Sequence, residues 1–176
     1  GMNMKYDYII VGGGSAGCVL ANRLSRNNDH RILLIEAGGA DTSPWIKIPV
    51  GYFKTIHNPQ MDWCYKTEPE PELNNRILDW PRGKVLGGSS SINGLLYIRG
   101  QAGDYDQWAQ EGNAGWSYDD VLPLFKQSES YEYGSDEYHG SVGGLNVSKI
   151  RAKSQISEAF IGAAVEMGVP RSNDFN

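Results

Sequence analysis

A glycine-rich turn near the N-terminus, Gly12-Gly13-Gly14-Ser15-Ala16-Gly17, limits the folds open to this chain more than any other feature. It lies between a β-branched apolar run at residues 6–11 and a helical pattern that begins at Val19. Gly12 permits a tight turn, Gly14 lets the backbone approach a phosphate, and Gly17 allows close packing of helix on strand. The spacing therefore predicts a pyrophosphate site at the positive end of the helix.

A second strand is predicted at residues 31–36, an uninterrupted apolar run that ends in Glu36. Together with the first strand and the helix, which should end near residues 27–29, it forms a βαβ unit with a parallel sheet. Glu36 is placed to accept hydrogen bonds from the adenosine ribose hydroxyls, and its charge disfavours NADP. The alternative is a solvated residue beside an ordinary glycine turn. NAD and FAD both remain open, because both carry the ADP half.

A second glycine turn, at residues 82–91, contains Gly87-Gly88-Ser89-Ser90 and the positive charges of Arg82 and Lys84. The amides of small residues can cradle a phosphate or lie against a flat ring. A single nucleotide does not need two glycine cradles about 70 residues apart in the sequence, whereas a long cofactor stretched across the fold can use both. The second turn therefore disfavours NAD.

Composition excludes several classes of protein. The 176 residues carry a net charge of -5 and the sequence pI is about 5.2, so no global field favours nucleic acid. Cys18 and Cys64 are too few for a disulfide framework and lack metal-ligand spacing. We therefore predict no metal site, and either a reducing cytoplasm or a protein indifferent to the redox state of its compartment, with the cytoplasm as the expected location. No apolar run reaches the roughly 20 residues of a membrane span, so at most a peripheral association with the inner face of the membrane is expected. Gly1 is interpreted as the scar of a cleaved tag.

Two stretches are expected to be irregular. Residues 37–80 lack periodicity, and their aromatic residues either line a substrate entrance or, as we favour, pack locally to fix a long loop. The acidic stretch 128–137 is interpreted as a solvated loop.

The second half of the chain carries helical patterns and one short alternating run. The last helix is interpreted as amphipathic core packing against a later domain. The expected elements are a helix at residues 104–110, a helix that starts from a capping box at Ser117 and Asp120 and kinks or restarts at Pro123, a strand at residues 145–148, and a helix at residues 154–167.

These motifs together resemble the glucose-methanol-choline (GMC) oxidoreductases, FAD enzymes that oxidise alcohols, and especially their bacterial choline and alcohol dehydrogenase branch. The resemblance runs from Tyr6 to the end of the chain. It is carried by residues 6–18, by Glu36-Ala37-Gly38-Gly39, above all by residues 83–94, and by Thr67-Glu68-Pro69, Tyr97, Gly100, Asp106, Tyr138-His139-Gly140 and Asn173-Asp174-Phe175-Asn176.

The resemblance implies an α/β, Rossmann-like FAD-binding domain that holds FAD along both glycine turns. Some relatives bond the flavin through a histidine just before the asparagine of the second motif; Ile92 stands there in this chain, so the FAD is expected to be non-covalent. The predicted cofactor-binding residues, with Arg82 added for its charge, are Gly12, Gly14, Ser15, Ala16, Gly17, Glu36, Ala37, Arg82, Val85, Gly88, Ser89, Asn93, Gly94 and Leu96.

The resemblance also implies that much of the enzyme lies outside this sequence. Residues 2–150 are predicted to be the N-terminal part of the FAD-binding domain, with 37–80 as a lid-like excursion, and residues 151–176 the start of an α+β substrate domain. The family's catalytic histidine lies near the C-terminus of a much longer chain, so no catalytic residue is assigned. His30, His57 and His139 are interpreted as surface or loop residues. An isolated chain is expected to fold poorly and to aggregate through exposed strand edges.

The expected activity is oxidation of a CH–OH group, with hydride transfer from an alcohol to flavin N5. Reoxidation by a quinone, by another acceptor or by oxygen is open, and the resemblance to the dehydrogenase branch favours an acceptor other than oxygen. The oligomeric state and the particular alcohol are open. Two alternatives are an NAD-dependent Rossmann dehydrogenase and a non-catalytic nucleotide-binding module. A yellow protein with flavin absorption bands would reject the first, and the intact mass of the protein tests the second.

Overall fold

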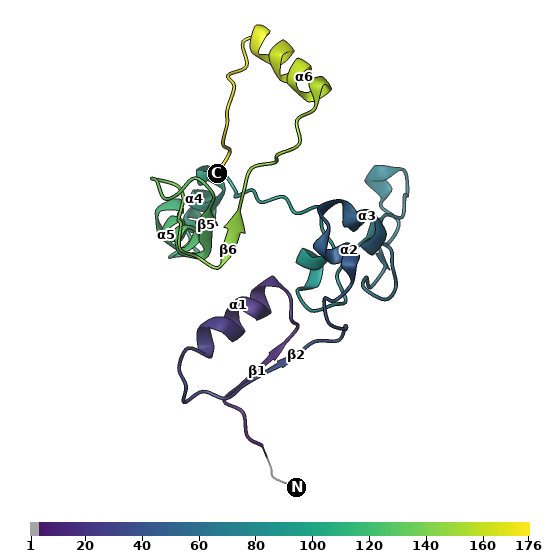
Figure 1. Cartoon of the computed structure of the whole chain (residues 1–176), viewed down its shortest axis with the longest axis vertical. Helices are drawn as coiled ribbons and strands as arrows, with labels where there is room; N and C mark the ends of the chain where they lie inside the picture. The colour runs from purple at the N-terminus through teal and green to yellow at the C-terminus, as the bar shows by residue number, and fades with distance from the viewer. Residues whose placement is uncertain (1–3) are drawn as a thin grey trace. The chain divides into compact units, whose positions relative to one another are not determined.

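The computed structural model of the chain describes residues 4–176, which divide into two compact units at the junction of Leu96 and Tyr97. We call the part up to Leu96 unit 1 and the part from Tyr97 unit 2 (Figure 1). The predicted division into residues 2–150 and 151–176 is a statement about domains of a longer protein, and it stays a prediction.

Unit 1 begins with the predicted βαβ unit. Strands β1 (Tyr8–Val11) and β2 (Ile32–Ile35) pair in parallel, with Tyr8 opposite Ile32, and helix α1 (Ser15–Leu24) connects them. Gly17 has no room for a side chain, because a Cβ there would clash with the carbonyl oxygen of Gly12. The third glycine of the turn therefore does what the sequence analysis predicted, which is to let α1 lie close to β1.

The predicted irregular excursion at residues 37–80 contains more regular structure than expected. Its first part holds three single-turn helices, α2 (Pro44–Lys47), η1 (Pro49–Gly51) and α3 (Tyr52–Thr55). Its second part is an antiparallel hairpin of β3 (Tyr65–Lys66) and β4 (Asp79–Trp80), with η2 (Pro71–Leu73) near the tip. Elements of two to four residues are too short to leave a periodic pattern, which explains why the sequence did not reveal them.

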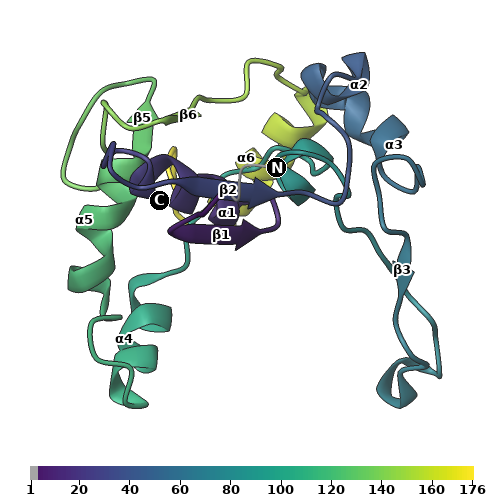
Figure 2. The same ribbon diagram turned by 90° about the horizontal axis from the view of Figure 1, so that it is seen from below.

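The hairpin continues past its two short strands. The backbone N–H of Trp63 donates to the carbonyl of Arg82 at 2.8 Å, and that of Lys84 donates to the carbonyl of Met61 at 2.8 Å. Figure 2 shows the resulting arm, which carries β3 away from α2 and α3. At its base the hairpin joins the second glycine turn, which forms η3 (Gly88–Ser91).

Unit 2 contains α4 (Ala102–Gln110), α5 (Tyr118–Ser128), the parallel pair β5 (Glu129–Tyr131) and β6 (Leu145–Val147), and α6 (Gln155–Glu166). The predicted helices and strand are confirmed. The capping box at Ser117 and Asp120 is present. Of the kink or restart expected at Pro123, the restart does not occur, since α5 continues through that residue; the kink stays a prediction. Pro123 has no backbone N–H, so the helix loses one hydrogen bond, the one to the carbonyl of Asp119 in its first turn. The capping box and the hydrogen bonds of the residues after Pro123 keep the helix intact.

The centre of unit 2 corrects two further predictions. Glu129 and His139 were interpreted as loop residues in contact with solvent, but both are 0% exposed. The prediction was wrong because β5 has only three residues, follows α5 directly and lies within an acidic stretch. Such a strand is too short to show an alternating pattern in the sequence.

Many apolar side chains of both units are exposed, including Val11 at 83%, Phe160 at 76% and Leu96 at 79%. Helix α6 has no buried residue within the part of the chain described. None of the helices in residues 4–176 combines the length and the apolar character that a bilayer crossing needs.

Candidate nucleotide-binding site

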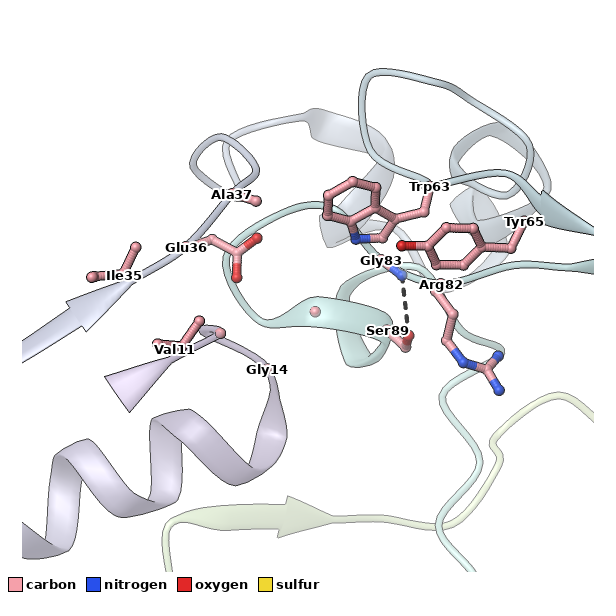
Figure 3. Close-up of a pocket in the computed structure, with 12 residues that line it drawn as sticks. Val11, Gly14, Ile35, Glu36, Ala37, Trp63, Tyr65, Arg82, Gly83 and Ser89 are labelled. Atoms are coloured by element: carbon pink, nitrogen blue, oxygen red, sulfur yellow. Dashed lines mark hydrogen bonds between the residues drawn. The ribbon is translucent and has the colours of Figure 1, made fainter. Parts of the chain in front are cut away.

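A pocket of about 480 Å³ lies in unit 1 where the βαβ unit meets the base of the hairpin (Figure 3). One side is formed by the carboxyl ends of β1 and β2, where ligands bind in open parallel sheets. The other sides come from the hairpin and the second glycine turn. The lining residues are Val11, Gly12, Gly14, Ile35, Glu36, Ala37, Trp63, Tyr65, Arg82, Gly83, Gly88 and Ser89.

The two glycine turns pack directly against each other. The N–H of Gly87 donates to the carbonyl of Gly13 at 2.7 Å, and the hydroxyls of Ser15 and Ser90 are 2.5 Å apart. A Cβ on Gly88 would lie 2.8 Å from the Cα of Gly14, and Gly88 has a φ of +59°. From the sequence, each glycine turn was expected to contact a different part of a long cofactor. In the structure the two turns contact each other and form one continuous wall of the pocket.

The N-terminus of α1 suits an anion. Its N-cap residue, Gly14, offers no side-chain cap, and the first turn contains no acidic residue. The first N–H groups of a helix have no partner inside the helix, and they carry the positive end of its dipole. These residues fit a phosphate held by backbone N–H groups.

Glu36 has a second role besides the one predicted. Its Oε2 accepts the N–H of Gly13 at 2.8 Å, and its Oε1 accepts the N–H of Gly38 at 2.8 Å. The carboxylate thus fixes the glycine turn to the loop after β2. Each carboxylate oxygen has a second lone pair, so Glu36 can still accept hydroxyl donors from the pocket.

Trp63 and Tyr65 form an aromatic wall of the pocket that the sequence analysis did not assign to the site. Their rings are parallel to within 4°, with centroids 5.7 Å apart, and the Lys84 ammonium lies 4.5 Å from the Trp63 centroid. Figure 3 shows both rings beside Glu36 and Arg82. The available signal was their spacing of two residues, which places both on one face of a strand.

Asp62 holds the base of the hairpin to the rest of unit 1. It is 2% exposed, and its carboxylate accepts the backbone N–H groups of His57 at 2.8 Å, Cys64 at 2.8 Å and Arg82 at 3.0 Å. Burial opposes ionisation, but these three donors outweigh it and hold the pKa of Asp62 below its ordinary value. Asp62 therefore stabilises the backbone that carries Trp63 and Arg82 at the pocket.

The structure gathers part of the predicted binding set at this pocket. Gly12, Gly14, Glu36, Ala37, Arg82, Gly88 and Ser89 line it. Val85 is 1% exposed and packs inside unit 1, and the Asn93 Oδ1 accepts the N–H of Leu95 at 3.0 Å. The residues predicted from the sequence that are not in its lining are Ser15, Ala16, Gly17, Val85, Asn93, Gly94 and Leu96.

The βαβ unit, the uncapped helix N-terminus and the acidic residue after β2 define a dinucleotide-binding protein of the α/β class. The chain belongs to the GMC oxidoreductase family, whose model matches residues 6–176. Its fold is that of the N-terminal FAD-binding domain of this family, in agreement with the fold class inferred from the sequence.

Individual relatives agree with the family assignment. The chain is 48% identical to an oxygen-dependent choline dehydrogenase of Photobacterium profundum, over 99% of this chain and 31% of that protein. It is 45% identical to an alcohol dehydrogenase [acceptor] of Pseudomonas putida, over 97% of this chain and 31% of that protein. A crystal structure of pyridoxine 4-oxidase from Mesorbium loti matches with a TM-score of 0.89 and 38% identity, over 96% of this chain and 33% of that one. The chain thus spans about a third of the length of these relatives.

Proposed function

We propose that this chain is the FAD-binding N-terminal part of an enzyme that oxidises a small-molecule alcohol. The observation that carries the proposal is the convergence of the α1 N-terminus, Glu36 and the second glycine turn on one pocket. Membership of the GMC family, whose members depend on FAD, supports FAD over NAD. The names of the choline and alcohol dehydrogenase relatives support an alcohol as the substrate.

The residues of the pocket suit the parts of the cofactor as follows. Gly14 lines the pocket beside the N-terminus of α1, whose first N–H groups lie behind it and bind the pyrophosphate, and Arg82 adds positive charge. Glu36 accepts the ribose hydroxyls while it holds the glycine turn in place. A bound FAD would supply the hydride acceptor for oxidation of the alcohol carbon. Trp63 and Tyr65 offer the flat faces of two parallel rings on one side of the pocket.

The wider assignments belong to the same proposal. Residues 2–150 contribute to the FAD-binding domain, and residues 151–176 begin the substrate domain of a longer protein. A quinone or another acceptor reoxidises the cofactor, and the protein works in the cytoplasm or peripherally at the inner face of the membrane. Oxygen as the acceptor is tested directly by comparing the rate of flavin reoxidation in air with the rate under a quinone without oxygen.

Non-covalent attachment rests on Ile92, which is 2% exposed and has no nucleophilic atom. Acid precipitation of the purified intact protein should leave the flavin in the supernatant, and the denatured protein mass should equal that of the polypeptide alone. A protein pellet that stays yellow, or a mass increased by that of FAD, would reject this attachment.

The cofactor itself is tested by binding. We expect the intact protein to show flavin absorption bands, and its apoprotein to bind ADP in competition with FAD. The Glu36→Ala variant should lose affinity for both ligands, because it removes the ribose acceptor and releases the Gly13 and Gly38 N–H groups. A colourless protein that binds NADH would establish the NAD-dependent alternative. Binding of FAD without oxidation of any alcohol by the intact protein would leave only the non-catalytic module.

A further inference from the structure

Unit 2 contains four charged side chains joined in one group, Arg99, Glu129, His139 and Asp174, which we call the charge quartet. Arg99 Nη2 lies 2.8 Å from Glu129 Oε2, and His139 Nδ1 lies 2.6 Å from Glu129 Oε1. On the other side of the ring, His139 Nε2 lies 2.5 Å from Asp174 Oδ2. The side chains of Glu129 and His139 are 0% exposed and that of Arg99 is 4% exposed, whereas that of Asp174 is 37% exposed.

The hydrogen-bond geometry together with the raised pKa of His139 indicates an imidazolium. A neutral imidazole has one donor nitrogen and one acceptor nitrogen, but both nitrogens of His139 face carboxylate oxygens. Only the doubly protonated ring donates to Glu129 and Asp174 at once. With that proton the quartet has two positive and two negative charges. Without it, a lone pair of the ring faces a carboxylate in a buried site, which is unfavourable.

The other groups around His139 preserve this state. The Tyr131 ring of β5 stacks on the imidazole with centroids 3.9 Å apart, and the Asp136 carboxylate accepts the backbone N–H of His139 at 2.7 Å. Burial lowers the pKa of His139, but the hydrogen bonds to Asp174 and Glu129 outweigh it and raise the pKa above its ordinary value. Burial also raises the pKa of Tyr131. Burial opposes ionisation of Asp174 as well, but its hydrogen bonds to His139 and to the N–H of Asn176, with a smaller contribution from the charge of Lys149, lower its pKa.

The quartet is one of two attachments of segment 172–176. The second is Asn176, whose Oδ1 accepts the N–H of Arg99 at 2.7 Å and whose Nδ2 donates to the carbonyl of Tyr97. The Asp174 Oδ1 also accepts the N–H of Asn176 at 3.1 Å, so the two attachments support each other. This segment ends the connection that follows α6, and Figure 1 shows α6 between two extended connections, away from β6.

We propose that His139 is a proton-dependent latch, which as an imidazolium bridges Glu129 and Asp174 to fix segment 172–176 and the connection after α6, and which releases both on losing its proton. The released state keeps the Arg99–Glu129 pair, because neither partner depends on the proton of His139. Because the connection after α6 is fixed only in the latched state, the latch restrains α6, which carries the exposed side chains of Ile156 and Phe160.

The direction with pH follows from the proton balance. A folded-state pKa raised above the unfolded value means that the latch contributes its full stability below about pH 6.5, the ordinary pKa of histidine. That contribution is lost as the pH rises through the higher pKa of the folded state. Release is therefore expected on the alkaline side of pH 6.5.

Hydrogen exchange of the intact protein between pH 6 and pH 10, corrected for the intrinsic pH dependence of exchange, tests the latch. The relevant amides are those of Arg99, Asp174 and Asn176, which donate hydrogen bonds inside the latched arrangement. We expect their protection to fall about tenfold or more across one transition, while amides within α4 keep theirs. The matched control His30→Gln, at a half-buried residue of unit 1 outside the charge quartet, should leave that transition unchanged.

Two variants separate a latch from a merely structural histidine. In Asp174→Asn one negative partner is lost without a change of shape, so the release midpoint should move down by about one pH unit or more. In His139→Gln the segment should exchange rapidly at every pH. Because a buried substitution can prevent folding, Asp174→Asn is decisive by itself: an unshifted midpoint, or a wild-type protection that stays flat to pH 10, would overturn the proposal.

Discussion

Asp62 is the residue on which the local backbone of the pocket depends most directly. One carboxylate accepts the backbone N–H groups of His57, Cys64 and Arg82. Arg82 itself lines the pocket, and Cys64 lies between two residues that line it. Hydrogen bonds to a charged acceptor are worth more than neutral ones, and unpaired donors that stay partly buried carry a penalty. The Asp62 carboxylate therefore helps to hold the backbone of Trp63 and Arg82 in place, together with the hydrogen bond between these two residues.

Replacement of Asp62 with alanine should lower the free energy of unfolding by about 2 to 3 kcal/mol, because three N–H groups lose their acceptor. Asp62→Asn keeps one acceptor oxygen and should lose less. Urea denaturation of the intact protein, followed by tryptophan fluorescence, measures both. The control Asp79→Ala removes an exposed carboxylate paired with Lys66 on the same hairpin and should change stability little. Equal losses in Asp62→Ala and Asp79→Ala would contradict this role.

The same carboxylate predicts an effect of acid. The pKa of Asp62 is lowered in the folded state, so its ionised form contributes full stability above the ordinary value near 4. That contribution is lost as the pH falls through the lower folded-state pKa. The stability difference between the wild type and Asp62→Asn should therefore be constant from about pH 5 to pH 7 and shrink below pH 4. A difference that grows on acidification would contradict the assignment.

The contact between the two glycine turns is the main feature at the level of elements. Gly88→Ala adds a Cβ 2.8 Å from the Cα of Gly14 at a positive φ, so the turns must separate or the backbone must change. We expect the affinity for FAD to fall about tenfold or more, which corresponds to about 1.4 kcal/mol. Titration of the apoprotein with FAD measures this loss. Gly39→Ala is the matched control, because a Cβ there meets no heavy atom within 4 Å.

Elements with strong local signals could be predicted from the sequence, and the others could not. The βαβ unit was recognisable because β-branched residues, glycines and a buried apolar run follow one another within about 30 residues. The helix at Ser117 was recognisable from its capping box. The hairpin left no signal, since β3 and β4 have two residues each and their pairing depends on Asp62 and on contacts distant in sequence.

The same limit applies to the sites. Gly12, Gly14 and Glu36 have fixed positions in a local motif, so their place at the pocket could be predicted. Trp63 lines the pocket only because the base of the hairpin packs beside the second glycine turn. That packing is a tertiary contact, and no local sequence pattern predicts it. The buried state of His139 depends on Asp174, 35 residues further on, and no local pattern encodes that pairing.

At the level of the whole chain, the parallel sheet of β1 and β2 is small. Among residues 4–176, β1 and β2 pair with each other and with no further strand, so each has an unpaired edge. The exposed fractions of Ile9 and Val11 are 60% and 83%. Doubly wound sheets of this class contain more strands and are covered by helices on both faces. Unpaired apolar edges of this kind add strands from other chains.

The 176-residue chain produced alone should therefore self-associate, which light scattering coupled to size-exclusion chromatography measures. Ile9→Lys places a charge on β1 and should reduce the associated fraction severalfold, because a charged strand resists pairing with a second copy. Val142→Lys makes the same chemical change at a residue that is 92% exposed and outside every strand described, so it should have much less effect. If both variants reduce association equally, net charge and not the β1 surface governs it. If the wild-type chain is monomeric at every concentration, the exposed strands do not act as an interface.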